Sequence, residues 1–230
     1  MSTLDPGHLA TLGNGAWYRS LPAPLQDWLC RHGRLLPLAA GQQLFARDGG
    51  ADGLYAVLDG AVRIGAVSAA GEEAILAILG PAQWFGEIAL FDGLARTHDA
   101  RAERDSLLLH VPLRALQELL AAQPAYWQDF GRLMAQKLRQ LFAVVEVVAL
   151  LPAPARVARV LMAIAEGYGE RRACAGQRVR LSQEQLARMV SLARQSVNQI
   201  MGQFEDDGAI RRVRGGFEVC DVQRLRRLAM

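Results

Sequence analysis

One stretch of the chain places polar side chains on the exposed face of an amphipathic helix. Its apolar positions recur at i, i+3, i+4 and i+7, which predicts a buried face formed by Val197, Ile200, Met201 and Phe204. The opposite face carries side chains whose donors and acceptors can recognise the edges of DNA bases, namely Arg194, Gln195, Asn198 and Gln199. The spacing therefore predicts a helix from about Ala193 to Glu205 that can read a base sequence.

A second helix is predicted directly before this one. Ser182 and Gln185 have the spacing of a capping box, in which each side chain satisfies a backbone N–H of the other residue. Two such helices joined by a tight turn form a helix-turn-helix, whose second helix enters the major groove of DNA. Ser191 occupies a turn position where glycine is usual, so a left-handed backbone there would cost about 1 kcal/mol. Ala193 offers the second helix no side-chain cap.

A basic β-hairpin is predicted over residues 210–220, with Arg211, Arg212 and Arg214 around the Gly215-Gly216 turn. Such a hairpin can act as a wing that contacts phosphates beside the groove. Residues 155–230 carry 14 arginines and no lysine against eight acidic residues, whereas residues 1–154 have a slight acidic excess. This asymmetry indicates a polyanionic partner for the last third of the chain. For the predicted helix pair, an ordinary helical hairpin is the alternative interpretation.

A long helix is predicted before this basic region, from about Ala125 to Leu150. Its apolar residues follow the 4, 3, 4, 3 spacing of a coiled-coil seam, formed by Met134, Leu138, Leu141, Val145 and Val148. We expect this seam to hold a homodimer; the alternative is a helix that packs only on its own sheet. Pro152 and Pro154 cannot continue the helix without a kink, so they predict a hinge.

The first half of the chain is predicted to be rich in short strands. Asp59-Gly60 between the predicted strands 56–58 and 61–65 is a strong hairpin signal. Further strands are predicted at 74–79 and 106–111, and this recurrence of short strands is typical of a jelly roll. The sequence therefore predicts an α+β chain with three parts: a jelly roll with N-terminal helices (1–123), a dimerisation helix and hinge (124–154), and a DNA-binding domain (155–230).

Several other classes of protein lack support in the sequence. The four histidines, His8, His32, His98 and His110, are scattered, so no metal enzyme is predicted. No nucleophile elbow or Walker loop occurs. The longest apolar stretch, Leu141–Leu151, contains Glu146 and is too short for a membrane helix. With no signal-peptide pattern, we expect a cytoplasmic protein without a membrane partner, and reduced thiols at Cys30, Cys174 and Cys220.

From about Leu25 to Leu228, the chain resembles the Crp/Fnr family of bacterial transcription regulators. Three segments carry the resemblance: Gly41–Phe45 with Gly53–Gly60; Phe85–Gly93 followed by Arg96-Thr97; and Leu181–Met201. In this family, a cyclic-nucleotide-binding jelly roll is joined by a long dimer helix to a winged helix-turn-helix. The resemblance implies a transcription regulator that is not an enzyme, forms a homodimer on a double-stranded DNA operator and contacts RNA polymerase. The alternatives are a winged-helix interaction adaptor without DNA binding, and a jelly-roll metal enzyme.

The resemblance also implies DNA contacts. The matching positions are Ser182, Arg194, Gln195, Ser196, Asn198, Gln199, Arg211, Arg212 and Arg214. Arg194 matches the family position that contacts guanine. Gln195 and Gln199 replace the Glu and Arg that are common there in the cyclic-AMP receptor, so we expect a different operator.

For an effector site, the resemblance implies a phosphate cassette and two residues of the long helix. The positions are Gly86, Glu87, Ile88, Ala89, Arg96, Thr97, Leu141 and Phe142. Arg96 would bind the cyclic phosphate, Glu87 would accept a hydrogen bond from the ribose, and Gly86 would allow close backbone approach. A structural ion pair between Glu87 and Arg96 is the alternative role for these two residues. His98 replaces a small residue after Thr97, which places an imidazole at the pocket.

Leu141 and Phe142 replace a Thr-Ser pair that contacts adenine in the cyclic-AMP receptor. Adenine recognition should therefore be weakened, because its polar edge would be buried without partners. The effector candidates are cyclic GMP, cyclic di-GMP and weakly bound cyclic AMP, and a site without effector is the remaining alternative. An iron–sulfur cluster is not expected because only Cys30 precedes the long helix. Haem sensing through His8, His32 or His98 stays open, without a spacing that supports it.

Overall fold

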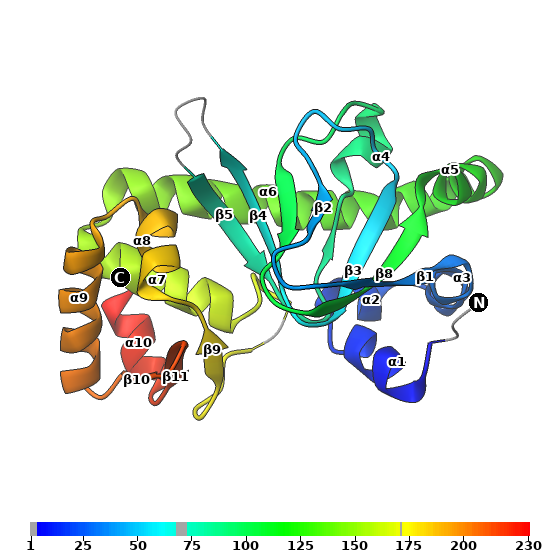
Figure 1. Ribbon diagram of the computed structural model, residues 1–230. Coiled ribbons are helices and arrows are strands. Elements are labelled where there is room, and N and C mark those ends of the chain that lie inside the picture. Colours follow the sequence, from blue (N-terminus) through cyan, green and yellow to red (C-terminus); the bar gives the residue numbers. More distant parts are fainter. Residues whose placement is uncertain (1–3, 68–72, 171) are drawn as a thin grey trace. The chain divides into compact units, whose positions relative to one another are not determined.

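The computed structural model describes residues 4–67, 73–170 and 172–230, which form two compact units (Figure 1). The first unit comprises Met1–Ala66 and Leu76–Leu138, and the second comprises Val67–Ile75 and Arg139–Met230. The first is built mainly on β-sheets and the second mainly on helices, which confirms the α+β prediction.

Two four-stranded sheets, in the orders β1-β8-β3-β6 and β2-β7-β4-β5, form a jelly roll. The strands of the first sheet are β1 (Arg34–Leu38), β3 (Gly53–Asp59), β6 (Trp84–Phe85) and β8 (Ser106–Pro112). Those of the second are β2 (Gln43–Phe45), β4 (Val62–Val67), β5 (Glu73–Leu79) and β7 (Asp99–Ala102). The predicted strands at 74–79 and 106–111 are confirmed as β5 and β8. The short helix α4 (Ile88–Asp92) follows β6.

The hairpin predicted at Asp59-Gly60 is wrong, because the strands on either side belong to different sheets. β3 pairs with β8 and β6, whereas β4 pairs with β7. Gly60 has a left-handed backbone (φ +86°), and a Cβ there would lie 2.2 Å from the Ser106 Oγ. That hydroxyl also accepts a hydrogen bond from the Ala61 N–H at 3.0 Å. The Asp-Gly turn therefore carries the chain from one sheet to the other, and at this crossing the backbone packs closely on Ser106.

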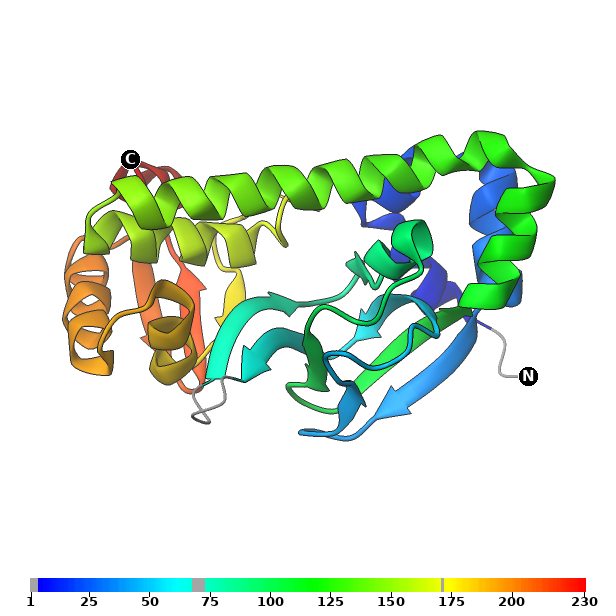
Figure 2. The same ribbon diagram turned by 90° about the horizontal axis from the view of Figure 1, so that it is seen from above.

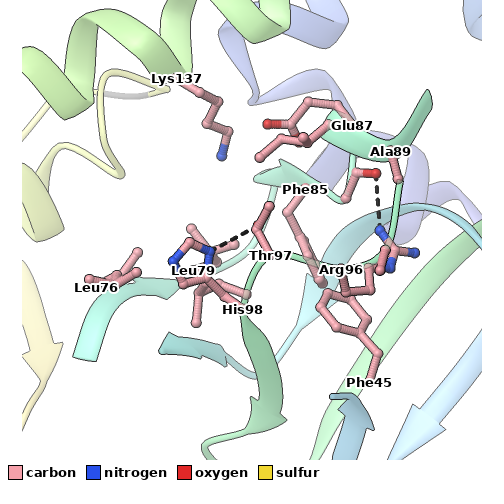
Figure 3. Close-up of a pocket in the computed structure, with 15 residues that line it drawn as sticks. Phe45, Leu76, Leu79, Phe85, Glu87, Ala89, Arg96, Thr97, His98 and Lys137 are labelled. Carbon is pink, nitrogen blue, oxygen red and sulfur yellow. Dashed lines mark hydrogen bonds between the residues drawn. The ribbon is translucent and has the colours of Figure 1, made fainter. Parts of the chain in front are cut away.

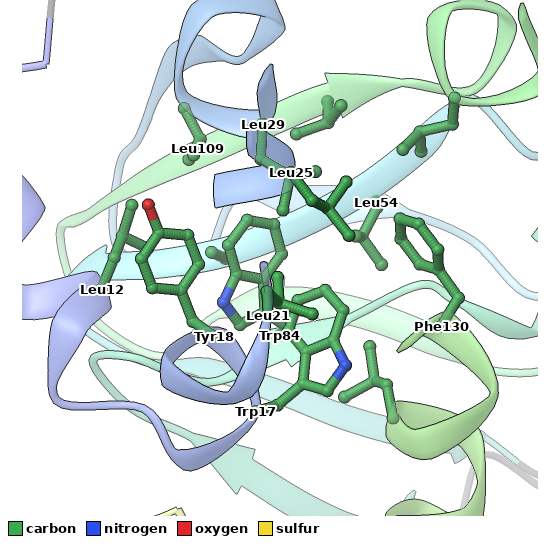
Figure 4. Close-up of a cluster of buried hydrophobic side chains, with 14 of the residues drawn as sticks. Leu12, Trp17, Tyr18, Leu21, Leu25, Leu29, Leu54, Trp84, Leu109 and Phe130 are labelled. Carbon is green, nitrogen blue, oxygen red and sulfur yellow. The ribbon is translucent and has the colours of Figure 1, made fainter. Parts of the chain in front are cut away.

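The main apolar core of the first unit lies between the β1-β8-β3-β6 sheet and the surrounding helices (Figure 4). These helices are α1 (Pro6–Gly13), α2 (Ala16–Ser20), α3 (Ala23–His32), α5 (Leu113–Ala122) and the start of α6, with the 3-10 turn η1 (Pro124–Tyr126) between the last two. The rings of Trp17 and Trp84 meet edge to face at 5.2 Å, and Phe130 lies 5.7 Å from Trp17. Trp17 Nε1 donates to the Asp129 carbonyl at 2.8 Å, which fastens α2 to α6.

The long helix α6 (Trp127–Leu150) is uninterrupted over 24 residues (Figure 2). Near its start, Phe130 and Leu133 are buried in the core, whereas its later apolar residues are exposed. The predicted break is confirmed, since α7 (Ala153–Ala165) begins with Pro152 as its N-cap. No helix in the described ranges is long and apolar enough to span a bilayer.

The second unit contains the predicted helix pair and a small sheet. The pair consists of α8 (Gln183–Val190) and α9 (Arg194–Asp206). β9 (Arg178–Arg180), β10 (Ile210–Val213) and β11 (Gly216–Val219) form an antiparallel sheet in the order β10-β11-β9. α7 and the C-terminal α10 (Val222–Leu228) complete a core that includes Leu161, Phe204 and Phe217. The wing hairpin was predicted, but β9 was not.

Candidate functional site

The first unit holds a pocket of about 260 Å³ whose lining is largely apolar (Figure 3). Phe45, Leu79, Phe85 and Ile88 are among its apolar walls, and they come from β2, β5, β6 and α4. Its ionisable or hydroxyl-bearing residues are Glu87, Arg96, Thr97, His98 and Lys137. A ligand that fits this pocket must therefore combine an apolar body with a few polar groups.

Arg96 is held inside a cage of protein acceptors. Its Nη2 donates to Asp52 Oδ1 at 2.5 Å and to the Gly53 carbonyl at 2.8 Å, and its Nη1 donates to the Gly86 carbonyl at 3.1 Å. The guanidinium carbon lies 4.3 Å from the centre of the Phe45 ring, and Figure 3 shows the two side chains together. The Arg96 side chain is only 4% exposed, and its Nε has no hydrogen-bond partner among the described residues.

A glycine makes room for this cage. Gly86 has a left-handed backbone (φ +94°), and a Cβ there would lie 2.9 Å from Arg96 Nη1 and 3.0 Å from the Gly53 carbonyl oxygen. Gly86 therefore allows close approach, as predicted, but in this structure the group that approaches is the chain's own arginine. The expected alternative partner for Arg96 was Glu87, and this is corrected: the arginine forms its ion pair with Asp52.

Asp52 is oriented by two aromatic residues of the neighbouring strands. Its Oδ2 accepts a hydrogen bond from the Tyr55 hydroxyl at 2.5 Å, and His110 Nε2 lies 3.2 Å from its backbone carbonyl oxygen. The Tyr55 and His110 rings stack at 4.6 Å. Burial raises the pKa of Asp52, but the hydrogen bonds from Tyr55 and Arg96 outweigh it and leave the pKa below its ordinary value. The carboxylate is therefore ionised at neutral pH.

The remaining polar groups of the pocket are less constrained than Arg96. His98 Nδ1 lies 2.9 Å from the Thr97 hydroxyl, and burial together with the charge of Arg47 lowers the pKa of His98. The imidazole is therefore neutral at pH 7, and it lines the pocket as predicted. Glu87, the residue before α4, is 4% exposed, and Lys137 reaches the pocket from α6.

Six of the eight predicted effector residues come together in this pocket: Gly86, Glu87, Ile88, Ala89, Arg96 and Thr97. The other two, Leu141 and Phe142, lie on the part of α6 that belongs to the second unit, where their side chains are 57% and 59% exposed. Sequence reasoning missed Phe45, Asp52 and Lys137. Lys137 precedes Leu141 by one helical turn, so the helix periodicity could have identified it.

In the second unit, the helix pair has the predicted local geometry. Ser182 Oγ accepts from the Gln185 N–H at 3.1 Å, and Gln185 Oε1 accepts from the Ser182 N–H at 2.8 Å, which confirms the capping box. Ser191 is left-handed (φ +52°, ψ +49°), and Ala193 forms no side-chain cap, as predicted. The turn between α8 and α9 is therefore strained at a non-glycine residue.

The exposed face of α9 carries side chains that have no partner within the described residues. Arg194, Gln195 and Gln199 are exposed and form no hydrogen bond or ion pair there, while Ser196 is half-buried. The Asn198 amide oxygen accepts from Gln183 Nε2 at 3.0 Å and from Arg212 Nη1 at 3.1 Å. Asn198 is thus fixed in orientation, whereas the other three side chains are available to a ligand.

The wing arginines divide into bound and free groups. Arg211 and Arg178 flank Glu218 across the sheet, with N–O distances of 2.9 and 3.2 Å. The Arg212 backbone N–H donates to Glu205 Oε1 at 2.8 Å and its Nε donates to Oε2 at 2.6 Å, and these two hydrogen bonds lower the pKa of Glu205. Arg214, at the wing turn, has no ion-pair partner in the part of the chain that the structure describes.

Arg180 joins Arg214 at the turn end of the wing. It pairs across the sheet with Gly216, and both arginines line a small notch above that glycine. Arg180 also lacks an ion-pair partner among the residues described. Sequence reasoning missed it because β9 has only three residues and gives no clear strand pattern. The two free arginines form a cationic notch on the exposed face of this sheet.

The predicted seam of α6 is exposed in the single chain. Leu138, Leu141, Val145 and Val148 are 47% to 57% exposed, and Met134 is half-buried. Four large apolar side chains left in water on one helix form a surface that favours association.

Comparison with known proteins gives two family matches. Residues 35–123 match the cyclic nucleotide-binding domain, and residues 155–228 match the Crp-like helix-turn-helix domain. A CRP-like cAMP-activated global transcriptional regulator of Mycobacterium tuberculosis is 30% identical over 82% of this chain and 85% of its own length.

Two solved structures share the fold. A transcriptional regulator of the CRP/FNR family from Thermus thermophilus is 26% identical, with a TM-score of 0.66 over 85% of this chain and 98% of its own. FixK2 from Bradyrhizobium japonicum is 21% identical, with a TM-score of 0.76 over 86% of this chain and 98% of its own.

Proposed function

The chain belongs to the Crp/Fnr family of bacterial transcription regulators, and we propose that it acts as a homodimer whose operator binding is controlled by a cyclic mononucleotide. It is a DNA-binding regulator and not an enzyme. The observation that carries the DNA-binding part is the exposed face of α9, where three polar side chains are free of intramolecular partners in the described structure. As a regulator of transcription, it would act in the cytoplasm and contact RNA polymerase on the promoter.

Direct reading of bases is assigned to α9. Arg194 can donate two hydrogen bonds to the O6 and N7 of guanine, and the amides of Gln195 and Gln199 are suited to adenine. Asn198 is less available because its carbonyl oxygen already accepts two hydrogen bonds. Ser182 and Ser196 are assigned to the phosphates that flank the groove.

Phosphate contacts of the wing are assigned first to Arg214, because it enters the complex without breaking an ion pair. Arg211 and Arg212 are held by Glu218 and Glu205, so each must exchange a carboxylate for a phosphate before it contributes fully. We therefore expect Arg211 and Arg212 to be weaker contacts than Arg214.

Dimerisation is assigned to the exposed seam of α6, formed by Met134, Leu138, Leu141, Val145 and Val148. A second copy offers the same seam, and two-fold pairing would bury both. The two recognition helices would then read half-sites about one helical turn apart. A charge at the centre, as in Leu141→Asp, should disrupt the dimer in sedimentation experiments, whereas a monomeric wild type at micromolar concentration would overturn the assignment.

The effector is assigned to the pocket of the first unit. Arg96 is the cation for a cyclic phosphate, Glu87 is the acceptor for a ribose hydroxyl, and Gly86, Ile88, Ala89 and Thr97 complete the wall. The similarity to a cAMP-activated regulator supports the cyclic nucleotide class. A volume of about 260 Å³ is small for a ligand site and favours one nucleotide over the two of cyclic di-GMP.

Cyclic AMP should bind weakly if the base meets Leu141 and Phe142, because neither side chain can pair with the adenine edge. Calorimetry with cyclic AMP, cyclic GMP and cyclic di-GMP tests the effector class. We expect binding of a mononucleotide that is lost in Arg96→Ala. Submicromolar binding of cyclic AMP would overturn the role of Leu141 and Phe142, and the absence of binding by all three would overturn the effector class.

The DNA-binding assignment is tested by selecting duplexes from a random pool with the purified protein. The selected site should then bind about 10³-fold or more tightly than a shuffled duplex at the same salt concentration. Equal affinity for the two duplexes would overturn sequence-specific recognition and favour an interaction adaptor.

A further inference from the structure

His98 lies beside the residues that are proposed to hold the phosphate of the effector. It follows Arg96 and Thr97 in the chain, and all three residues line the pocket. Its Nδ1 lies 2.9 Å from the Thr97 hydroxyl oxygen, and Figure 3 shows this hydrogen bond on the pocket wall. The imidazole is half-buried, so a ligand can reach it without a rearrangement of the chain. An anion held by Arg96 and Thr97 would therefore lie close to a ring that can take up a proton.

The surroundings of His98 favour a neutral ring in the free protein. Burial lowers the pKa of His98, the charge of Arg47 lowers it further, and the charge of Asp99 opposes both effects. The Asp99 carboxylate is oriented by the Arg47 backbone N–H, which donates to its Oδ1 at 2.9 Å. The other ionisable residues that line the pocket are Glu87, Arg96 and Lys137. A negative charge brought into this pocket by a ligand would favour the protonated ring and raise its pKa.

The hydrogen bond between His98 and Thr97 gives this proton a second effect. A neutral imidazole with its proton on Nε2 accepts the hydroxyl hydrogen of Thr97 at Nδ1, which leaves the hydroxyl only its lone pairs for a ligand. A protonated imidazole can only donate at Nδ1, so the hydroxyl hydrogen becomes free for a phosphate oxygen. Protonation of His98 therefore adds a positive charge and a hydrogen-bond donor to the same wall of the pocket.

We propose that His98 is an anion-binding residue of the effector pocket and that it takes up a proton when an anionic effector binds. This inference rests on the proposed effector class and adds a dependence on pH. The phosphodiester of a cyclic nucleotide stays ionised at mildly acidic and neutral pH, so the dependence arises in the protein. Affinity should be highest below the pKa of His98 in the free protein, and it should fall as the pH rises through the pKa in the complex.

Calorimetry with cyclic GMP and cyclic AMP at about pH 5.5 and about pH 8 tests this coupling. Each nucleotide that binds should do so about fivefold more tightly at the lower pH. At an intermediate pH, titrations in two buffers with different ionisation enthalpies should show a net uptake of protons from the buffer. The ring C–H signals of His98 in NMR spectra should titrate at a higher pH in the complex than in the free protein.

Three variants identify the residue that takes up the proton. His98→Asn keeps a polar group near Thr97 but cannot be protonated, so it should bind the nucleotide equally at the two pH values. His32→Asn is the matched control on α3 of the same unit, and it should keep the dependence. His110→Asn should keep it as well, although His110 Nε2 lies 3.2 Å from the Asp52 carbonyl oxygen beside the arginine. A dependence that persists in His98→Asn, or that is lost in His110→Asn instead, would overturn the proposal.

The outcomes also separate this inference from the effector assignment. Nucleotide binding that depends on Arg96 but has the same affinity at both pH values would overturn the proton uptake and leave the effector class intact. NMR signals that show a protonated His98 in the free protein at neutral pH would do the same. The absence of nucleotide binding at either pH would overturn the effector class and the role of His98 together.

Discussion

Arg96 and Arg194 show how differently the two units use the same side chain. Arg96 lies in the pocket of the first unit, 4% exposed, with an aspartate and two carbonyl oxygens as partners. Arg194 lies at the start of α9 in the second unit, exposed and without a partner in the described structure. One guanidinium is already occupied, whereas the other is ready for a ligand.

The difference has an energetic consequence. Arg96 already donates to one carboxylate and two carbonyl oxygens, so only its Nε lacks an acceptor in the described structure. A ligand of Arg194 must displace only water and order one side chain. The proposed DNA-reading side chains therefore await a partner, whereas the guanidinium of the proposed effector pocket is largely satisfied within the protein. Four predictions test this contrast, and the first has the largest expected effect.

Arg96→Ala should destabilise the first unit by about 3 kcal/mol, because it removes a buried ion pair and leaves two carbonyl oxygens without donors. The same change at Arg194 should alter stability by no more than about 0.5 kcal/mol. All four tryptophans of the chain, Trp17, Trp28, Trp84 and Trp127, lie in the first unit, so their fluorescence during urea unfolding reports on it directly. Equal midpoints for Arg96→Ala and wild type would contradict the structural importance of the cage.

Arg194→Ala should weaken operator binding by about 1–3 kcal/mol and relax the preference at one base pair of each half-site. Fluorescence anisotropy on the selected operator and on its single-base variants measures both effects. Arg227→Ala is the matched control, since Arg227 is an exposed arginine on α10, outside the recognition helix. An equal loss of affinity for the operator and for all of its single-base variants would make Arg194 a phosphate contact instead.

Arginines of the wing sheet with and without an ion-pair partner should contribute differently to the salt dependence of DNA binding. Arg180→Ala and Arg214→Ala should each lower the slope of log K against log salt by about 1. Arg211→Ala should lower it less, because Glu218 already neutralises that charge. Glu218→Gln should raise the slope, since it releases Arg178 and Arg211 together. If all three alanine variants shift the slope equally, the ion pairs do not survive in the complex and the distinction fails.

Ser191→Gly should stabilise the helix pair by about 0.5–1 kcal/mol, because glycine adopts the left-handed backbone at that turn without a Cβ penalty. Amide hydrogen exchange in α8 and α9 would report this gain as greater protection. Ser191→Ala is the control and should bring no gain. Reduced protection in the glycine variant would show that the serine side chain stabilises the turn.

Features that depend on neighbouring residues were predictable from the sequence. The capping box of Ser182 and Gln185, the left-handed Ser191 and the break at Pro152 are each set within a few residues of chain. The exposed seam of α6 followed from helical periodicity, and the jelly roll followed from the recurrence of short strands. Each of these predictions used information that one element carries by itself.

Features that depend on distant pairing were not predictable in the same way. Asp52 and Arg96 are 44 residues apart, and only the sheet pairing brings them together. The Asp59-Gly60 signal identified a turn, but a turn signal does not say whether the next strand stays in the same sheet. The ion pairs of Arg211 and Arg212 likewise depend on cross-strand register and on α9. Residue types therefore indicated the candidate sites, and the fold decided which of their side chains lack a partner in the described structure.

The coupling of the two units is tested most directly by fluorescence anisotropy on the selected operator, with and without cyclic GMP at a concentration that calorimetry shows to be saturating. If the pocket controls DNA binding, the nucleotide should change operator affinity by a factor of about 5 to 150, and affinity for shuffled DNA should change much less. Identical operator titrations with an occupied pocket would contradict effector control of this regulator.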